Sequence, residues 1–558
     1  MLKAGGRRLL GQILKDSGKI GEGQVQEALA QQRESGGLLG EVLVGLGHCT
    51  VVDVTHGLAE QAGLRAVDLS REAPTPEALE RVDASTAHAF GVLPLSLEED
   101  VLEVALGDPL NTSLLEDLRF STGLDVVGAL GDAEQIAALV RTHYGEEASV
   151  RDAIADASGV RPGDEDAASS APVVRLLNSI LHRAVRDRAS DVHFEVFPGE
   201  LRIRFRVDGS LYEIEAPPAH LAAPLVARIK VLSSLDIAET KLPQDGRIAF
   251  AIDGRPVDLR VATLPAISGE GCVLRVLDRS SVSLELSALG LEEHEQAALI
   301  ELTHLPHGIV LVTGPTGSGK TTTLYAMLSE ANRPDVKIVT VEDPVEYDIE
   351  GIVQIPIHED IGVDYAKILR TVLRQDPDKI LVGEIRDAET AAVAVEASLT
   401  GHTVFATVHT NDAPSAIARL LDLGLEPFLV TATLEAIVAQ RLVRKVCTQC
   451  RVEVELDSDR ELELSHTVAG WEDAQLVRGR GCEACFHTGY RGRTAIVEIM
   501  RMDEGLREAI LQGKSTDELS QLARASGMKG LRERGLEVAL RGGTTVEEVL
   551  RETMAAGD

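Results

Sequence analysis

The chain of 558 residues is poor in aromatic side chains and in positive charge. Aromatic residues make up 3 % of it, so it has few side chains on which the bases of a nucleic acid could stack. Its 55 lysines and arginines stand against 89 acidic residues, and a general nucleic-acid binder needs clustered cations. We therefore expect no nucleic-acid partner. Small phosphates are not excluded, because backbone amides can bind them in a local pocket.

Long hydrophobic runs are also missing. No stretch of about 18 uninterrupted apolar residues occurs, so the sequence predicts no membrane span. The amino-terminal stretch starts basic, but Gln12, Lys15 and Asp16 interrupt its apolar residues, unlike the apolar core of a signal peptide. We therefore expect a cytoplasmic protein. Six cysteines are too few for a disulfide scaffold, although four of them form two C-x-x-C pairs.

The pattern of the chain predicts several parts. Residues 9–32 recur as residues 38–61, and each copy predicts a short helix, a glycine break and a second helix. Strand-like and helix-like runs alternate from there to about residue 144. The predicted parts are an N-terminal docking or regulatory module over 1–145, an acidic linker, flexible or partly helical, over 146–170, an α/β domain over 171–285, a parallel-sheet domain over 286–445, a tetracysteine subdomain over 446–500 and a helical C-terminal part over 501–558.

Residues 286–445 alternate buried strands, glycine loops and helices, which is typical of a parallel sheet with crossover helices. The predicted strands are 309–313, 337–341, 379–382 and 403–408. Upstream, apolar residues alternate with arginines over 201–207, which predicts a strand that continues through an Asp-Gly hairpin turn. Near the end of the chain, Thr545 and Glu548 have the spacing of a helix capping box.

The segment Gly314–Thr321 reads GPTGSGKT and matches the phosphate-binding pattern G-x-x-x-x-G-K-[ST]. An apolar strand precedes it and a helix follows it, so backbone N–H groups and the helix amino terminus would surround a β-phosphate. Lys320 would reach the β- and γ-phosphates, and the Thr321 hydroxyl would bind Mg²⁺. We predict ATP and Mg²⁺ as ligands, with the nucleotide held by Gly314, Pro315, Thr316, Gly317, Ser318, Gly319, Lys320, Thr321 and Thr322.

Acidic residues follow two further strands of the predicted sheet. Glu342, Asp343 and Glu346 come after one strand, and Glu384 comes after another. Ligands of such sheets bind beyond the carboxyl ends of the strands, so these side chains should face the phosphate site. Hydrolysis needs a carboxylate that orients or deprotonates water, and both Glu384 and Glu346 are candidates. The alternative is that these acids cap helices or form surface pairs.

His402 and His409 flank a third strand, and either could sense phosphate or have a structural role. We expect His409 to converge with the two glutamates at the phosphate edge. Gly383 stands where many P-loop enzymes have the aspartate that binds Mg²⁺. The metal would therefore be held mainly by Thr321 and water.

These motifs resemble those of the type II secretion and type IV pilus assembly ATPases over about residues 191–444, through stretches such as LDIAETKLPQDGR, VEDPVEY, LRQDPDKILVGEIRD and AQRLVRKVC. The resemblance implies an α/β multidomain fold, in which a PAS-like α/β domain precedes a RecA-like P-loop ATPase domain. It also implies a homo-hexamer, with arginines that complete the γ-phosphate site. The matching positions are Arg260 and Arg275 in the smaller domain and Arg370, Arg374 and Arg386 in the ATPase domain.

Cys447, Cys450, Cys482 and Cys485 form two pairs that are separated by 31 residues. Four thiolates in this pattern satisfy tetrahedral Zn²⁺ with no open position, so we predict a structural zinc site. Disulfides and idle thiols are the alternatives. The tetracysteine segment also resembles the assembly ATPases and separates them from the retraction ATPases of pili. The remaining cysteines, Cys49 and Cys272, are expected to be core residues.

The tandem repeat resembles the cyclic-di-GMP-binding module that some of these ATPases carry at the N-terminus. Leu9 and Leu38 occupy the positions where that module has arginine, although Arg8 is adjacent to one of them. Cyclic-di-GMP is therefore a candidate ligand whose binding the two leucines put in question. The alternative is a docking domain that contacts the secretion machinery through protein surfaces.

The function that these observations predict is that of a hexameric motor that hydrolyses Mg-ATP. The resemblance implies that it powers pseudopilus assembly in type II secretion or type IV pilus extension. It further implies an inner-membrane platform protein and a cytoplasmic or membrane linker protein as partners, so that a cytoplasmic chain is recruited peripherally to the inner membrane. The alternatives are a nucleotide-binding regulator with vestigial hydrolysis and a RecA-like nucleic-acid translocase.

Overall fold

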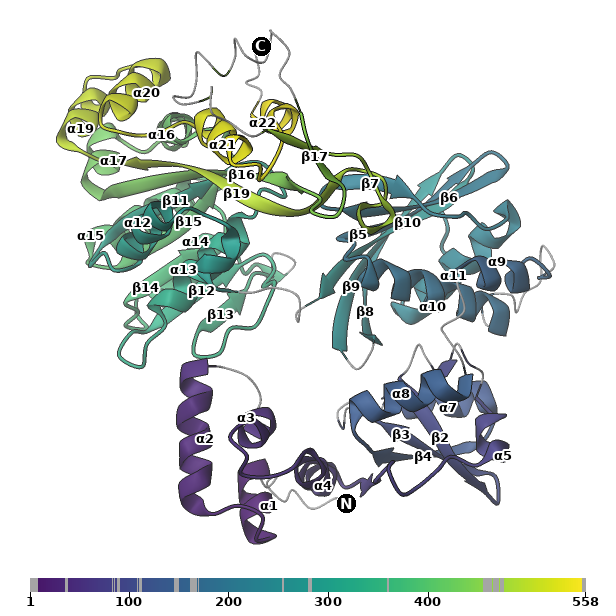
Figure 1. The fold of residues 1–558 in the computed structure, drawn as a ribbon. Coiled ribbons are helices and arrows are strands. Elements are labelled where there is room, and N and C mark those ends of the chain that lie inside the picture. Colours follow the sequence, from purple (N-terminus) through teal and green to yellow (C-terminus); the bar gives the residue numbers. More distant parts are fainter. Residues whose placement is uncertain are drawn as a thin grey trace. The chain divides into compact units, whose positions relative to one another are not determined.

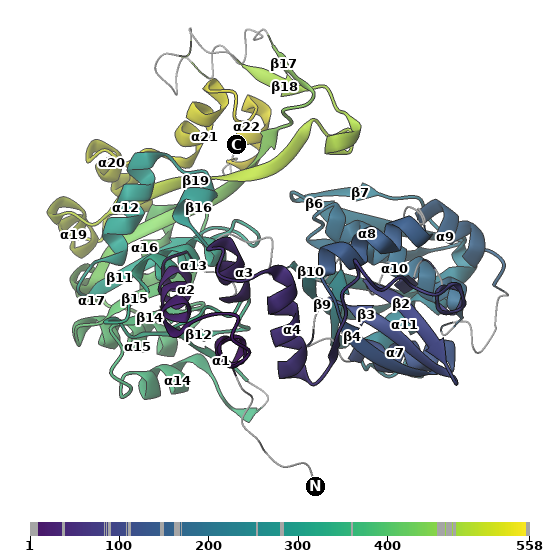
Figure 2. The same cartoon turned by 60° about the horizontal axis from the view of Figure 1, so that its bottom comes forward.

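The structure is a computed structural model. It describes residues 9–35, 39–82, 84, 86–87, 91–107, 109, 113–144, 150–160, 168, 170–252, 255–278, 284–358, 361–454, 464, 471 and 476–553. The chain divides into two compact units, Met1–Ser280 and Ser281–Asp558, each of which is described by itself. Figures 1 and 2 show their elements. Among the described helices, none has the length and apolar character needed to cross a membrane.

The first unit begins with the tandem repeat, which forms two pairs of helices as predicted. Helix α1 packs on α4 and helix α2 packs on α3, around a small core that includes Leu14 and Leu43. Equivalent positions of the two copies make equivalent contacts: Lys19 pairs with Asp53 (2.7 Å), and His48 contacts Gln24 (3.2 Å). The helices are α1 (Leu10–Asp16), α2 (Glu22–Ser35), α3 (Leu39–Gly45) and α4 (Val51–Ala62).

A small α/β layer follows the repeat. Its four-stranded sheet has the order β1-β4-β3-β2, and only the pairing of β2 with β3 is antiparallel. Helix α4 contributes Ala59 to the core of this sheet, so the repeat and the α/β layer share buried surface. The elements are β1 (Arg65–Ala66), α5 (Pro76–Leu79), β2 (Val92–Glu98), β3 (Val101–Leu106), α7 (Ser113–Thr122), β4 (Asp125–Leu130) and α8 (Ala133–Tyr144).

The last part of the first unit is an antiparallel sheet of six strands in the order β7-β6-β5-β10-β9-β8. Helices α10 and α11 cover one of its faces (Figure 1). Helix α9, within the predicted linker, packs on α10 and buries Val150, Ala153 and Ala157 in the same core. The elements are α9 (Val150–Ala157), α10 (Ala171–Arg186), β5 (Asp191–Phe197), β6 (Glu200–Val207), β7 (Ser210–Glu213), α11 (Ala222–Leu232), β8 (Gln244–Ile252), β9 (Arg255–Ala266) and β10 (Gly269–Asp278).

The second unit is built on a seven-stranded sheet in the order β13-β12-β14-β15-β11-β16-β19. Its strands are parallel except for β19, and the four predicted strands lie within one residue of their observed bounds. The elements are α12 (Glu293–Thr303), β11 (Gly308–Thr313), α13 (Lys320–Ala331), β12 (Ile338–Glu342), β13 (Val353–Pro356), α14 (Tyr365–Val372), β14 (Lys379–Val382), α15 (Ala388–Leu399), β15 (Thr403–Val408), α16 (Ala413–Asp422), α17 (Pro427–Thr433), β16 (Leu434–Val446) and β19 (Tyr490–Arg501).

The C-terminal helices complete this unit. Leu506, Ala509 and Leu519 join the large core on one face of the seven-stranded sheet. Between β16 and β19 the chain carries the cysteines and a two-stranded ribbon. The elements are β17 (Arg451–Glu453), β18 (Val477–Gly479), α19 (Glu504–Leu511), α20 (Thr516–Ala525), α21 (Leu531–Leu540) and α22 (Val546–Glu552).

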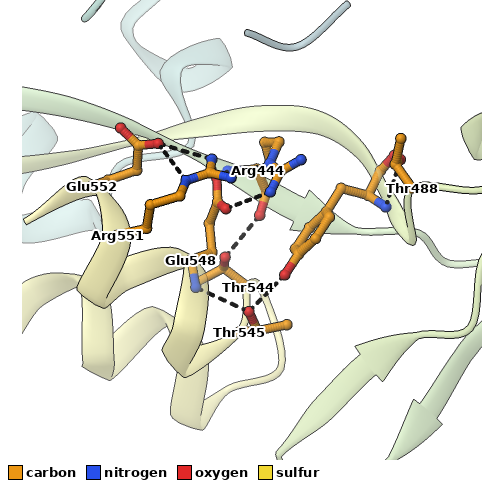
Figure 3. Close-up of polar contacts among 8 residues, drawn as sticks. Arg444, Thr488, Thr544, Thr545, Glu548, Arg551 and Glu552 are labelled. Atoms are coloured by element: carbon orange, nitrogen blue, oxygen red, sulfur yellow. Dashed lines mark hydrogen bonds and ion pairs between the residues drawn. The ribbon is translucent and has the colours of Figure 1, made fainter. Parts of the chain in front are cut away.

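The predicted capping box at the start of α22 is only half correct. Thr545 Oγ1 accepts a hydrogen bond from the Glu548 amide (3.2 Å), as the spacing predicts. The Glu548 carboxylate does not return to the N-cap residue. It accepts instead from Arg444 of β16, because a nearby guanidinium is a stronger donor than a backbone amide. Figure 3 shows this network.

Candidate nucleotide site and metal centre

The phosphate loop lies between the end of β11 and the start of α13. Gly314, Gly317 and Gly319 have φ values of 144°, 80° and 87°, a region that other residues rarely adopt. The side chain of Ser318 is buried, while Pro315, Thr316 and Gly317 are exposed. The loop thus presents its backbone at the carboxyl edge of the sheet and runs directly into a helix amino terminus, an arrangement that suits a phosphate.

Lys320 is the first residue of α13, and its side chain lies along the loop. Its Nζ donates to the carbonyl oxygens of Gly314 (2.7 Å) and Pro315 (3.1 Å). Burial lowers the pKa of Lys320, and the negative charge of Glu384 acts in the opposite direction. The ammonium group is therefore held within the loop, on the side of the predicted catalytic carboxylate.

Glu384, Arg386 and His409 form one polar cluster beyond the ends of β14 and β15. Glu384 pairs with Arg386 (2.8 Å) through one carboxylate oxygen and with His409 Nε2 (3.1 Å) through the other. Burial alone would raise the pKa of Glu384, but the hydrogen bond from Arg386 and the charge of His409 outweigh it and keep that pKa below its usual range. The carboxylate is therefore ionised at neutral pH.

Gly383 has a steric reason to be glycine. A Cβ at this position would lie 3.0 Å from Tyr365 Oη and 3.1 Å from the carbonyl oxygen of Val341. Few real Cβ atoms are this close to a neighbour. An aspartate at this strand end would therefore require its neighbours to shift by a few tenths of an ångström, which gives a packing reason for the glycine.

The other acidic residues of this edge have different surroundings. Glu342 is 4 % exposed, and its carboxylate accepts from Tyr325 Oη, from Thr340 Oγ1 (2.5 Å) and from Gln354 Nε2 (3.2 Å). Its oxygens are therefore engaged inside the protein, which is a structural role. Glu346 lies in the segment after β12, where its backbone amide donates to Tyr325 Oη (3.3 Å).

The two histidines lie at opposite ends of β15. His409 follows the carboxyl end and contacts Glu384. His402 precedes the amino end, where its Nδ1 lies 2.9 Å from the carbonyl oxygen of Ala397 and 3.1 Å from Thr400 Oγ1. Because only the carboxyl end of β15 borders the phosphate loop, His402 lies at the opposite edge of the sheet, in the loop between α15 and β15.

The arginines that the resemblance assigns to the smaller domain belong to the first unit. Arg260 and Arg275 are direct partners across β9 and β10, on the face of the sheet that the helices leave uncovered. The same register places Arg247 beside Arg260, and Asp191 beside Arg275 and Arg206. This row therefore gathers four arginines and one aspartate on the uncovered face, although like charges directly opposite each other destabilise a sheet.

Asp191 is the acidic member of this row. One of its oxygens lies 3.2 Å from Arg275 Nε and the other lies 3.7 Å from Arg206 Nε. In the second unit, Arg370 pairs with Glu389 (2.8 Å), and Arg374 donates to the carbonyl oxygen of Arg370 (2.8 Å). Of the five arginines that the resemblance assigns, Arg386 is the one that contacts Glu384.

The four paired cysteines converge near the end of β16 and the start of β19. Their sulfur atoms all lie within 4.8 Å of one another, and the separations Cys447–Cys482, Cys450–Cys485 and Cys482–Cys485 are 3.9, 3.8 and 3.7 Å. Four sulfurs at about 2.3 Å from one zinc ion lie about 3.8 Å apart at the corners of a tetrahedron. The sulfur positions therefore fit Zn²⁺.

The surroundings of Cys485 also favour a metal-bound thiolate. Backbone amides of Cys482 (3.2 Å) and Gly489 (3.3 Å) donate to its sulfur. Burial would raise the pKa of Cys485, but these amides outweigh it and lower the pKa to about 7. Zinc at this site would crosslink the end of β16 to the start of β19, because Cys447 follows β16 and Cys485 precedes β19.

Zinc content provides a direct check of this site. Purified protein is expected to carry about one zinc ion per chain, and Cys450→Ser is expected to lose most of it, because three thiolates leave the tetrahedron incomplete. Cys49→Ser is the matched control, since Cys49 lies in the N-terminal helical core. The measurement is metal analysis after gel filtration. Equal zinc in both variants would contradict the assignment.

Comparison with known proteins places this geometry in a family. The family model described as "Type II/IV secretion system protein" matches residues 166–551, which is more than half of the chain. The chain belongs to the type II/IV secretion system protein family. The resemblance that the motifs indicate is thereby confirmed. A second model, described as "MshEN domain", matches residues 62–150 of this family member, so the tandem repeat of residues 9–61 lies before that match.

Two relatives show how far the likeness extends. The type IV pilus assembly ATPase PilB of Myxococcus xanthus is 40 % identical over 557 residues, covering 98 % of each chain. The type II secretion system protein E of Xanthomonas campestris is 44 % identical over 535 residues, covering 94 % of each chain. The structure of the ATPase DotB of Yersinia pseudotuberculosis, 22 % identical, covers 68 % of this chain and 93 % of that chain with a TM-score of 0.51, a likeness of fold.

Two residues that lie beside candidate site residues, one in each unit, were not predicted from the sequence. Arg247 lies in the arginine row, and its signal was present in the QDGR stretch that carries the resemblance. Gln440 contacts the phosphate loop from β16. Its signal was the polar pair Gln-Arg inside the apolar run IVAQRLV, where a buried polar side chain needs a partner.

Proposed function

We propose that the chain is a motor that hydrolyses Mg-ATP and powers the assembly of a pseudopilus or of a type IV pilus. One observation carries the proposal: the phosphate loop with Lys320 and the ionised Glu384 share the carboxyl edge of one sheet. The names of the two relatives, one a pilus assembly ATPase and one a type II secretion protein, support the process that it serves.

Each residue of the site has a distinct part in the proposed reaction. The loop amides and Lys320 bind the β- and γ-phosphates, and Thr321, exposed at the start of α13, provides a hydroxyl ligand for Mg²⁺. Bound Mg²⁺ would neutralise developing charge on the phosphates. Glu384 accepts the proton of the attacking water, while Arg386 and His409 hold its carboxylate in place. Glu346 is the second candidate for this base.

The arginine face of the first unit supplies the remaining positive charge in this proposal. Arg260 and Arg275 would contact the γ-phosphate, where charge develops on the transferred group. The finer fold assignment, a PAS-like domain before a RecA-like ATPase domain, and a homo-hexameric assembly belong to the same proposal. So does recruitment to the inner membrane through a platform protein and a linker protein. The order of the two units agrees with the order of the domains in that assignment.

Cyclic-di-GMP binding by the N-terminal module stays a prediction. The match to the MshEN domain supports a regulatory module, and Leu9, at the position where arginine is expected, is 75 % exposed. Leu38 lies outside the described residues. An exposed leucine provides no charge for a phosphate, so titration of the full chain with cyclic-di-GMP decides whether the module binds it.

Removal of the Lys320 ammonium tests the proposed function. Lys320→Ala is expected to lower kcat/KM for Mg-ATP by about 100-fold or more, because a donor that faces developing charge contributes that much. The matched control is Lys379→Ala, which removes a buried lysine at the amino end of β14 and so at the opposite edge of the sheet. Phosphate release by the wild type and both variants is the measurement.

The same assay separates the alternatives. Equal rates in the wild type and Lys320→Ala would contradict ATP hydrolysis at this site. Tight nucleotide binding without turnover, even in assembled hexamers, would favour a regulator with vestigial hydrolysis. Stimulation of the rate by single-stranded DNA at low salt would favour a nucleic-acid translocase.

A further inference from the structure

Gln440 is an amide side chain buried in the middle of strand β16, with 1 % of its surface exposed. In the parallel pairing of β16 with β11, Ala439 is the partner of Thr313, so Gln440 lies beside Gly314 where the phosphate loop begins. Burial of an amide costs free energy unless its polar atoms are hydrogen-bonded. The partners of this amide therefore explain why the strand retains it.

Both ends of the amide are engaged by the phosphate loop and the helix that follows it. Gln440 Nε2 donates to the carbonyl oxygen of Ser318 (2.8 Å), and its Oε1 accepts from Thr323 Oγ1 (2.7 Å). Thr323 itself is fully buried in the first turn of α13. One side chain thus connects the last part of the loop to the helix.

The hydrogen bond to Ser318 has a consequence for the loop amides. In a trans peptide the C=O and the following N–H point in opposite directions. Because Gln440 holds the Ser318 carbonyl toward the sheet, the N–H of Gly319 is directed away from the sheet. Backbone N–H groups with this orientation are the ones that bind phosphate at a helix amino terminus.

Close packing leaves the loop no room to move toward the strand. A Cβ at Gly314 would lie 2.5 Å from the backbone oxygen of Gln440, and a Cβ at Gly319 would lie 2.8 Å from Gln440 Nε2. Two glycines of the motif are therefore needed for contact with this one residue, in addition to their left-handed φ values. The loop backbone rests directly on Gln440.

We propose that Gln440 is a positioning residue for the phosphate chain of the bound nucleotide. It fixes the Ser318–Gly319 peptide so that the loop amides face the β-phosphate. It acts through the loop and does not contact the nucleotide. The proposal rests on the proposed function, because it assumes that the loop binds a nucleoside triphosphate.

Three variants of the full chain test this proposal. Gln440→Leu removes both hydrogen bonds at similar volume. Gln440→Glu keeps the acceptor for Thr323 but, when ionised, places an oxygen against the Ser318 carbonyl. The matched control is Thr494→Val in β19 of the same sheet, which is 7 % exposed and loses a hydrogen bond to the carbonyl oxygen of Gly290 (3.1 Å).

The measurements are the Kd of a fluorescent ADP analogue, the KM and kcat for Mg-ATP, and the thermal unfolding midpoint. Gln440→Leu is expected to raise Kd and KM by about tenfold or more, the effect of losing charge-facing amides, with a smaller change in kcat. Thr494→Val is expected to lower the unfolding midpoint with Kd within about twofold of the wild type.

A pH profile adds a readout that a purely structural role would not change. The carboxyl group that Gln440→Glu introduces can, when protonated, donate to the Ser318 carbonyl as the amide does, and burial raises the pKa of such a carboxyl. The affinity of Gln440→Glu is therefore expected to recover toward the wild-type value between pH 8 and about pH 6. That of Gln440→Leu is expected to follow the wild type in its pH dependence.

Several outcomes overturn the proposal. A Kd within twofold of the wild type in Gln440→Leu does so, as does a loss that Thr494→Val reproduces at equal unfolding midpoint. If Gln440→Leu does not fold, Gln440→Glu provides the test, and an affinity that does not vary with pH relative to the wild type overturns the proposal. Failure of the wild-type chain to bind nucleotide would instead contradict the proposed function.

Discussion

Glu384→Gln is expected to lower kcat for Mg-ATP by at least about 100-fold, since a positioned general base contributes about 10²- to 10⁴-fold. Glutamine keeps the size of the side chain and can still contact Arg386 and His409, but it cannot accept the proton of water. Nucleotide affinity is expected to stay within about threefold, because the loop that binds the phosphates is unchanged. Single-turnover phosphate release and ADP-analogue binding are the measurements.

The control for this prediction is Glu396→Gln, which changes an exposed carboxylate on α15. The parallel variant Glu346→Gln decides between the two candidate bases. If Glu346→Gln loses the rate and Glu384→Gln keeps more than about a third of it, Glu346 is the base and the assignment of Glu384 is wrong.

The pKa of Glu384 sets the expected pH dependence of the same reaction. This pKa lies below the ordinary value of 4.5 in the folded protein, so the carboxylate is ionised and able to accept a proton above that value. Activity controlled by Glu384 is therefore expected to fall only as the pH drops below about 4.5. A decline of kcat centred near pH 6 would assign control of the rate to another group.

Loss of the Glu548 carboxylate is expected to produce the largest change in stability. Arg444 donates to both Glu548 oxygens from its guanidinium (2.9 and 2.7 Å), and the side chain of Glu548 is 1 % exposed. Thr544 Oγ1 adds a hydrogen bond to the Arg444 carbonyl oxygen (2.7 Å; Figure 3). Glu548→Ala is expected to lower the free energy of unfolding by about 3–5 kcal/mol, because the largely buried Arg444 guanidinium loses its carboxylate partner.

The comparison variant for this prediction is Glu301→Ala. Glu301 pairs with Arg501 at 2.7 Å, but its side chain is 67 % exposed, so the expected loss is about 0–1 kcal/mol. Denaturant unfolding compares the two variants, and hydrogen exchange of the α22 amides localises the effect. A loss in Glu548→Ala no larger than that in Glu301→Ala would show that the Arg444 pair does not hold α22 to the sheet.

The central strands of the second unit were predictable because strands buried on both faces appear as uninterrupted apolar runs. The phosphate loop was predictable because its function requires particular residues at fixed spacing. His409 and Glu384 followed from topology, since the carboxyl ends of parallel strands share an edge. Topology also places His402 at the other edge, and its contact with Ala397 agrees with that position.

Other features depend on contacts between parts of the sequence that lie far apart. Strand β19 is part of the main sheet, but its partner β16 precedes it by the whole cysteine segment, and long-range antiparallel pairing is not encoded in either strand alone. Glu548 has the spacing of a capping residue, and its preference for Arg444 depends on a strand about a hundred positions earlier. Gln440 acquires its role only once β16 lies beside the loop.

The position of β19 in the chain has a consequence for synthesis on the ribosome. Strand β16 ends at Val446 and its partner begins at Tyr490, so the segment 447–489 must be made before the sheet can close. At about 5–20 residues per second this takes about 2–9 s, during which β16 is an unpaired edge with apolar residues such as Val438 and Val443. The nascent chain therefore has an aggregation-prone interval that ends only after the last of the four paired cysteines, Cys485, has emerged.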